Sequence, residues 1–266
     1  MKLSVIITNY KTPELLKLCL KSVKSAAADL EYEIIILDSE VDDEENGPIK
    51  EEFNETKYLP FKKNVGYAKL VNEGLKEARG EYLLILNADM VLEKDAVEKM
   101  IGYLEKETSA GILGPKLLNF NGSTQDSCFR FYKFSTVFSR RTIWGETSWG
   151  GRELERFLMR DFNHREIREV DWLLGAALMV RQKAFQEVGP MDERFFLYFE
   201  DVDWCRRFKE KDWKVIYFPE ARMNHYHGRQ SRKSGGLRDL FFNKYVWIHI
   251  WSALKYFWKY RLKKSV

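Results

Sequence analysis

Cysteine is scarce in this sequence of 266 residues: there are three, Cys19, Cys128 and Cys205. They are widely spaced and odd in number, which matches neither a zinc site nor a disulfide framework. The first ten residues enter a strand directly and lack the cleavage site of a signal peptide. We therefore expect a cytoplasmic protein, and peripheral contact with the inner face of the cell membrane stays open.

Long apolar runs and a large net charge are also missing. No stretch reaches the roughly 18 uninterrupted apolar residues of a membrane-spanning helix. The net charge is only +4, so nothing global points to nucleic acid as a partner. Hydrophobic residues make up 45% and charged residues 32%, which is ordinary for a soluble protein long enough to bury a sizeable core.

What the sequence does contain is an alternation of strand and helix signals in its first hundred residues. Pro13 follows Thr12, a plausible N-cap, and apolar residues then recur at helical spacing. A second helix is expected from Gly66 to Ala78. The expected strands are residues 3–8, 33–37, 57–61 and 81–86. This alternation predicts an open α/β fold with a parallel sheet.

Polar residues follow three of these strands. They are Thr8-Asn9-Tyr10, Asp38-Ser39 and Asn87-Ala88-Asp89. Ligands bind beyond the carboxyl ends of the strands in such sheets, so these residues should meet at one crevice. Asn64-Val65-Gly66-Tyr67 and Asn72 open a helix near the same edge, where the glycine allows backbone to approach a ligand closely or simply serves a loop.

Two interpretations of Asp89 are open. A carboxylate at a strand end can coordinate a divalent cation that also binds a diphosphate. Alternatively, Asp89 caps a helix beginning near Glu93 or Lys94, and local sequence alone favours this second reading.

Two further clusters carry ionisable groups. Glu200-Asp201 could open a helix, where acids are favourable in the first turn, or could supply a general base, which the aromatic run 195–199 favours. His225-Tyr226-His227 could bind a metal or lie on an exposed strand; the basic residues after it favour a diphosphate-facing loop.

The second half is less regular. Residues 120–168 mix glycine, serine, aromatics and arginine, which suits long loops around a site. Residues 170–180 predict a strand, and Gln182 to Val188 a short helix that ends at Gly189-Pro190.

Four blocks taken in order resemble the family 2 glycosyltransferases, within them the bacterial rhamnosyltransferase-like members. The blocks are LSVIITNYKTPELLKLCLKSV, NVGYAKLVNEGLKEARGEYLLILNAD, VDWLLGAALMVRQKAFQEVGPMDERFFLYFEDVDWCRRFKEKDW and HYHGRQS. The resemblance implies a GT-A fold with a Rossmann-like, mostly parallel central sheet flanked by helices. It implies a domain over residues 1–235, divided into a nucleotide-sugar-binding half (1–115) and an acceptor-binding half (116–235).

The resemblance also assigns roles. Asp201 matches the catalytic base, with Glu200 beside it orienting the acceptor. Asp89 and His225 match the metal ligands for Mg²⁺ or Mn²⁺, and His227 is the competing histidine. The residues expected at the nucleotide-sugar are Thr8, Asn9, Tyr10, Asp38, Asn64, Gly66, Asn87, Ala88, Arg229 and Arg232. Those expected at the acceptor are Trp172, Gly175, Tyr198 and Asp203.

Two departures from the family pattern affect the assignment. The metal motif often reads Asp-X-Asp, and here its first position is Asn87. The loop that usually reads Asp-Asn-X-Ser is here Asp38-Ser39-Glu40-Val41-Asp42, which leaves the contacts to base and ribose open.

The resemblance implies an inverting glycosyltransferase acting on a hydroxyl of a glycan or of a lipid-diphosphate-linked sugar. L-rhamnose from dTDP-L-rhamnose is the preferred donor, with a UDP-hexose or UDP-N-acetylhexosamine as the alternative. A non-catalytic nucleotide-sugar- or glycan-binding protein is the alternative from another class.

Residues 236–266 predict a basic amphipathic helical tail. Trp247, Trp251, Leu254 and Trp258 recur at helical spacing, and lysines and arginines surround them. Such a helix suits a membrane interface. Packing on the catalytic domain or on a second subunit, as in a homodimer, is the alternative.

Overall fold

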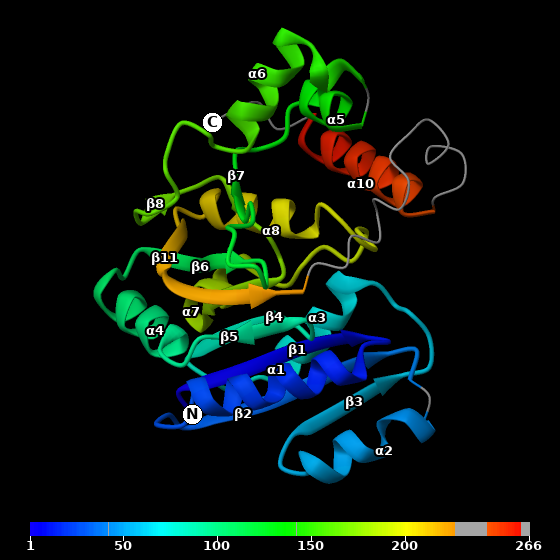
Figure 1. Ribbon diagram of the computed structural model, residues 1–266, viewed down its shortest axis with the longest axis vertical. Helices are drawn as coiled ribbons and strands as arrows, with labels where there is room; N and C mark the ends of the chain where they lie inside the picture. Colours follow the sequence, from blue (N-terminus) through cyan, green and yellow to red (C-terminus); the bar gives the residue numbers. More distant parts are fainter. Residues whose placement is uncertain (42, 142, 227–243, 262–266) are drawn as a thin grey trace.

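The protein is described by a computed structural model over residues 1–41, 43–141, 143–226 and 244–261 (Figure 1). Its first half alternates strand and helix as expected. The elements in chain order are β1 (Leu3–Tyr10), α1 (Pro13–Ala26), β2 (Tyr32–Ser39), α2 (Asp43–Glu52), β3 (Lys57–Phe61), α3 (Tyr67–Glu77), β4 (Tyr82–Asn87), β5 (Met90–Leu92), α4 (Ala96–Lys106) and β6 (Ala110–Leu118).

A single sheet of nine strands runs through the molecule, in the order β3-β2-β1-β4-β10-β6-β11-β5 with β8 (Arg168–Glu169) beside β11. The strands β3, β2, β1 and β4 are parallel. In the second half β10 (Ala177–Arg181) is antiparallel to both neighbours, while β11 (Lys214–His225) is parallel to β6 and antiparallel to β5. The expected α/β sheet flanked by helices is confirmed, and the strands β10, β5 and β8 run against the direction of the others.

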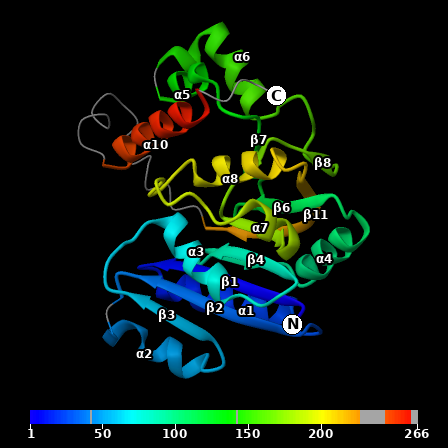
Figure 2. The ribbon, with the colours of Figure 1, turned by 180° about the vertical axis from the view of Figure 1, so that it is seen from behind.

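The central strands are hydrophobic on both faces because helices cover both. Side chains alternate along β1: Val5 and Ile7 join the core shared with α1 and α4, while Ile6 joins the core shared with α3. Figure 2 shows α3 on the face opposite α1. Burial on both faces explains why the strand sequences read as continuous apolar runs.

The expectation of long loops over residues 120–168 is wrong. The segment holds β7 (Cys128–Phe129), α5 (Phe134–Arg141), a 3₁₀ turn (Ile143–Glu146) and α6 (Ser148–Phe157). The hydroxyl of Thr147 accepts a hydrogen bond from the Gly150 N–H, which caps α6. Pairs of glycines and aromatics masked this helical signal in the sequence.

The strand expected over residues 170–180 is interrupted. It divides into β9 (Trp172–Leu173), which pairs with β7, and β10, with Leu174, Gly175 and Ala176 between them. The helix α7 (Gln182–Val188) is as predicted and ends at Gly189, whose φ is 82°. The helix α8 (Glu200–Lys209) follows the aromatic run.

The described part of the tail is the helix α10 (Lys244–Arg261), and it packs on the domain (Figure 1). Ala253, Tyr256 and Tyr260 are buried in the same core as α3 and α8. This face of α10 therefore packs on the domain, which was the alternative to a membrane interface. Among the described helices, none combines the length and the apolar character that crossing a membrane requires.

Candidate active site

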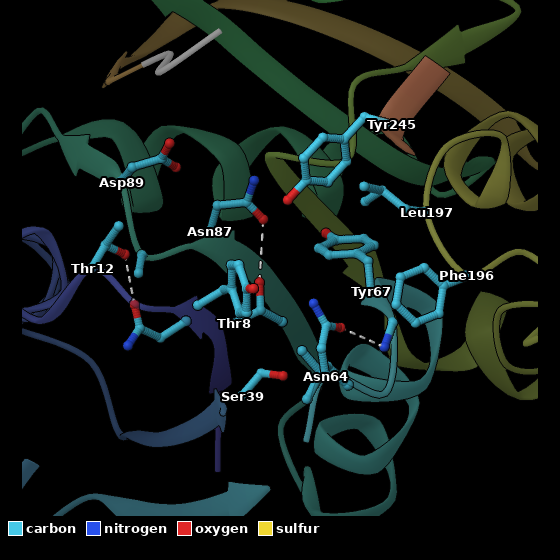
Figure 3. A pocket seen from close by; sticks show the side chains of 15 residues that line it. Thr8, Thr12, Ser39, Asn64, Tyr67, Asn87, Asp89, Phe196, Leu197 and Tyr245 are labelled. Carbon is cyan, nitrogen blue, oxygen red and sulfur yellow. Dashed lines mark hydrogen bonds between the residues drawn. The ribbon is translucent and has the colours of Figure 1, made fainter. Parts of the chain in front are cut away.

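A pocket lies where β1, β2 and β4 end, as the sequence predicts for an α/β sheet (Figure 3). Loops before α3 and α8 close one side, and the first turn of α10 reaches over it. The residues that line it are Thr8, Asn9, Tyr10, Thr12, Ser39, Asn64, Gly66, Tyr67, Leu70, Asn87, Ala88, Asp89, Phe196, Leu197 and Tyr245.

The ends of β1 and β4 hold each other in register. Thr8 pairs with Asn87 across the parallel strands, and the Thr8 hydroxyl donates to the Asn87 side-chain oxygen at 3.2 Å. The Thr12 hydroxyl donates to the Asn9 side-chain oxygen at 2.7 Å instead of capping α1. These bonds fix the orientation of two amide side chains that face the pocket, which suits recognition of polar ligand groups.

Asp38 supports the pocket from behind. Its carboxylate accepts hydrogen bonds from the Asn9 amide at 2.9 Å and from the Tyr58 hydroxyl at 2.7 Å, and it is 2% exposed. Burial raises its pKa, and the bonds from Tyr58 and Asn9 oppose that rise. At this strand end Ser39, not Asp38, lines the pocket. The structure brings Asp38 to the site through Asn9.

Gly66 is required by backbone geometry. Its φ is 88°, and a Cβ there would lie 2.6 Å from the carbonyl oxygen of Phe196. The Asn64 side-chain oxygen accepts from the Gly66 N–H at 2.9 Å, and the Tyr67 N–H donates to the Phe196 carbonyl at 2.9 Å. The loop before α3 is thereby joined to the loop before α8.

Asp89 and His225 meet although 136 positions separate them in the chain. The short strand β5 follows Asp89 and pairs with the end of β11, where His225 lies opposite Met90. The His225 Nε2 lies 3.5 Å from the Asp89 Oδ1. The capping alternative for Asp89 is wrong, because the chain continues into β5 and α4 begins only at Ala96, after Asp95.

The orientation of the His225 ring follows from Gln125. The Gln125 side-chain N–H donates to the Asn119 side-chain oxygen and to the His225 carbonyl, so its own oxygen faces His225 Nδ1 at 2.9 Å. Nδ1 must then carry a proton that it donates, which leaves the lone pair of the neutral ring on Nε2 toward Asp89. The Asp89 Oδ1 is buried and accepts no hydrogen bond. An oxygen and a nitrogen lone pair that face each other fit a cation between them.

Among the described residues, no group of three or more His, Cys, Asp and Glu side chains could hold a metal by themselves. A cation at Asp89 and His225 would therefore need further ligands from a bound molecule. Phosphate oxygens are ligands of this kind.

Glu200 and Asp201 begin α8 and are both buried, at 5% and 8% exposed. The Asp201 carboxylate accepts from the Gly175 N–H at 3.1 Å and from the Val202 N–H at 2.9 Å. The Glu200 Oε2 is buried and accepts no hydrogen bond. The two neighbouring carboxyl groups thus have different environments.

Their pKa values separate accordingly. Burial raises the pKa of Asp201 to about 6, and the backbone N–H groups of Gly175 and Val202 limit that rise. Burial raises the pKa of Glu200 well above its usual value, and the nearby charge of Asp201 adds to this. At neutral pH Asp201 is then ionised and able to accept a proton, while burial makes Glu200 hold its proton more tightly than an ordinary glutamate does.

Tyr67 and the segment Gly175–Ala176 connect this acidic pair with the pocket. The Tyr67 ring lines the pocket, and its hydroxyl donates to the Gly175 carbonyl at 2.5 Å. The Asn87 N–H donates to the Ala176 carbonyl at 3.0 Å. Burial raises the pKa of Tyr67, and so do the charges of Glu200, Asp201 and Asp89. Asp201 therefore lies behind Gly175 and Tyr67, outside the residues that line the pocket, whereas Asp89 lines it.

All four residues predicted at the acceptor, Trp172, Gly175, Tyr198 and Asp203, lie outside the pocket lining. The Trp172 indole is stacked on Phe129 and donates to the Arg130 carbonyl. The Tyr198 ring packs on His249. The Asp203 carboxylate is fully buried and bound by Arg207, Lys259 and Tyr260. We infer a structural role for Asp203, because no part of it is exposed.

Three other predicted residues, His227, Arg229 and Arg232, lie outside the described residues. Sequence reasoning missed Phe196, Leu197 and Tyr245, which line the pocket. Ser39 and Tyr67 were expected near the crevice and Thr12 only as an N-cap, and all three line the pocket. Tyr245 had no signal in the sequence, because only the packing of α10 brings it to the pocket.

Comparison with known proteins agrees with this geometry. The family model "Glycosyl transferase family 2" matches residues 4–189. The chain is 25% identical over 238 residues to the N-acetylglucosaminyl-diphospho-decaprenol L-rhamnosyltransferase of Mycobacterium tuberculosis, which covers 84% of this chain and 76% of that protein. It is 24% identical over 192 residues to rhamnosyltransferase WbbL of Escherichia coli K12, covering 72% of this chain and 67% of that one.

The fold also matches solved glycosyltransferase structures. The crystal structure of S. aureus TarS superimposes with a TM-score of 0.58 at 16% identity, over 85% of this chain. This chain covers only 36% of the TarS chain. The family match spans well over half of the sequence and the architecture is GT-A, so the chain belongs to glycosyl transferase family 2 and resembles its rhamnosyltransferases.

Proposed function

We propose that this protein is an inverting glycosyltransferase that transfers L-rhamnose from dTDP-L-rhamnose to a hydroxyl of a glycan or of a lipid-diphosphate-linked sugar. The observation that carries this proposal is the placement of two different acidic sites around one pocket. Asp89 with His225 lies at one side, and Asp201 lies at the other, behind Gly175 and Tyr67.

The chemistry follows from the protonation states. Asp201 removes the proton from the acceptor hydroxyl as that oxygen forms a bond to C1 of the donor sugar. The bond between C1 and the phosphate oxygen breaks, and the nucleoside diphosphate leaves with the electron pair. Attack from the face opposite the diphosphate inverts C1. Glu200, beside Asp201, orients the acceptor.

Asp89 and His225 are the residues that would hold Mg²⁺ or Mn²⁺. A divalent cation supplies charge that stabilises the diphosphate as negative charge builds on it. The support in this chain is the buried Asp89 oxygen without a hydrogen bond and the Nε2 lone pair that Gln125 directs at it. Arg229 and Arg232 stay predicted diphosphate contacts.

The donor is supported by the relatives that are named rhamnosyltransferases. The lipid-linked acceptor is supported by the name of the mycobacterial relative. The alternative is the same chemistry with a UDP-hexose or UDP-N-acetylhexosamine donor. A panel of nucleotide sugars with Mn²⁺ or Mg²⁺ in a thermal-shift assay separates these donors, because a ligand that binds the folded state raises the melting temperature.

The substitution Asp201→Asn tests the mechanism. It keeps the size of the side chain but removes the base, so we expect kcat to fall by about 10²–10⁴-fold. Donor binding, measured by calorimetry, should change little, because Asp201 lies outside the pocket lining.

The matched control is Asp212→Asn, at an exposed position whose φ of 60° asparagine tolerates. It should leave both measurements unchanged. Loss of donor binding equal to the loss of kcat in Asp201→Asn would contradict the assignment of the base. A protein that binds donor but never turns it over with any acceptor would be the non-catalytic alternative.

A further inference from the structure

The helix α10 has two opposite apolar faces. Its buried face packs on the domain through Val246, His249, Ser252, Ala253, Tyr256 and Tyr260. Its other face holds Trp247, Trp251, Leu254 and Trp258, which are 47%, 59%, 46% and 69% exposed. At 3.6 residues per turn these two sets lie on opposite sides of the helix. Packing on the domain therefore buries one face of α10, and the three tryptophans on the opposite face stay exposed to solvent.

The exposed face continues onto α5. The Phe134 ring contacts the Phe257 ring edge-on at 5.7 Å, and Phe134 lines one hollow together with Leu254 and Trp258. Phe134 and Phe138, one turn apart on α5, are 65% and 53% exposed. Figure 1 shows α5 beside α10. We call the surface formed by Trp247, Trp251, Leu254, Trp258, Phe134 and Phe138 the aromatic face.

Positive charge accompanies the aromatic face on α10. Lys244, Lys255 and Arg261 on this helix are exposed. Neither α5 nor α10 contains an aspartate or a glutamate. Exposed tryptophans on a helix that carries lysine and arginine and no acid match the headgroup region of an anionic bilayer, where indole rings lie at the boundary between polar and apolar layers.

The aromatic face also adjoins the active site. Tyr245, two residues before Trp247 on α10, lines the donor pocket, and its hydroxyl points toward Asn87 (Figure 3). A surface that held α10 against a bilayer would bring the pocket beside lipid headgroups.

We propose that the aromatic face docks on an anionic lipid bilayer. The tryptophans and phenylalanines enter the interface, and the lysines and arginines contact the acidic headgroups. The helix lies flat on the membrane, since its buried face stays packed on the domain. Docking on lipid requires neither the donor sugar nor catalysis, so its test is independent of the test of the proposed function.

Flotation of the full chain with vesicles tests the proposal. The protein should float with vesicles of phosphatidylcholine containing phosphatidylglycerol, and much less with phosphatidylcholine alone or at high salt. The double variant Trp251→Ser/Trp258→Ser should lower the partition coefficient at least about tenfold. The double variant Lys255→Gln/Arg261→Gln should lower it by a similar factor and only on the anionic vesicles.

The control is Leu18→Ser, which removes an exposed apolar side chain (50% exposed) from α1, far from α10 in the fold. It should float as the unchanged protein does. Thermal melts of all variants should agree within a few degrees, because every substituted side chain is exposed. Donor binding should persist in the tryptophan variant, which keeps a failure of docking distinct from a failure of the proposed function.

Two results would overturn the proposal. One is equal flotation of the tryptophan variant and the control. The other is a dimer of the unchanged protein that the tryptophan variant converts to a monomer without any flotation of either, since the aromatic face would then be an interface between two copies.

Discussion

At the scale of single residues, neighbouring carboxyl groups acquire different properties from different hydrogen bonds. Asp201 accepts two backbone N–H groups, whereas the Glu200 Oε2 accepts none. Burial raises the pKa of both carboxyl groups, and the backbone N–H groups of Gly175 and Val202 limit the rise at Asp201. Two neighbouring carboxyl groups in one acidic dipeptide thus acquire different surroundings.

The pH dependence of turnover should report Asp201. Its pKa of about 6 means that the base loses its charge below that pH. We expect kcat/KM to fall about tenfold for each pH unit below about 6 and to level off above it. Asp212→Asn should keep the same profile. A profile that is flat from about pH 5 to 7 would remove Asp201 as the base.

Glu200 should reduce stability at neutral pH. Its folded-state pKa is raised by burial, so the folded protein binds this proton more tightly than the unfolded chain does. The free energy of unfolding then decreases as pH rises above the unfolded-state value of about 4.3. Glu200→Gln removes this effect and should raise the melting temperature at pH 8 by about 2–4 °C or more.

Below the unfolded-state pKa the gain from Glu200→Gln should vanish, because both forms are then neutral. Glu220→Gln, at an exposed position on β11, should have no effect at either pH. A gain that does not depend on pH would show that the carboxylate charge is not its cause.

At the scale of elements, short segments position the site more than the long ones do. The three residues of β5 join Asp89 to His225, and the loop at Gly66 joins α3 to the segment before α8. That segment contains Tyr198 and Phe199 with φ of 68° each, a conformation that costs energy for residues other than glycine. The two residues immediately precede Glu200 and Asp201, which form the first turn of α8.

Gly66→Ala should disturb the junction of these loops. It combines an unfavourable φ with a Cβ only 2.6 Å from the Phe196 carbonyl oxygen. We expect a loss of about 2–4 kcal/mol in the free energy of unfolding, measured with denaturant, and weaker donor binding because Asn64 moves.

The control, Gly122→Ala, has a φ of 80° but no atom within 4 Å of the added Cβ. It should cost about 1 kcal/mol and leave donor binding intact. Equal effects of the two substitutions would mean that the contact with Phe196 is unimportant.

At the scale of the whole molecule, α10 is part of the catalytic domain. Lys259 lies between Asp192 and Asp203, with its Nζ 2.8 Å and 2.5 Å from their carboxylates. It joins the C-terminal helix to α8 and to the loop before it. Removing the whole tail would uncover this core and the pocket wall at Tyr245, so substitutions on the exposed face are the better test of docking.

Lys259→Ala should lower the free energy of unfolding by about 1–3 kcal/mol, since the fully buried Asp203 would keep only Arg207 and Tyr260 as partners. Lys255→Ala, on the exposed side of the same helix, should change it by less than about 0.5 kcal/mol. Urea unfolding of both variants measures this difference. Equal losses would show that Lys259 does not anchor α10.

Much of the site could be predicted from the sequence, because its residues stand at the ends of strands. Thr8, Asn9, Asn87 and Asp89 stand directly after apolar runs, and parallel strands bring such ends together. The helices of residues 134–157 did not follow, because paired glycines and aromatics obscure their helical periodicity. Tyr245 was missed because only the packing of α10 brings it to the pocket.

Taken by itself, the sequence determined the α/β class, the order of the first strands and the residues at their ends, since hydrophobic periodicity and turn chemistry are local. Tertiary structure alone decided that β5 would bring His225 to Asp89, that Glu200 and Asp201 would separate in pKa, and that α10 would bury one face and expose the other. Each of these depends on contacts between segments far apart in the chain, which no local pattern encodes.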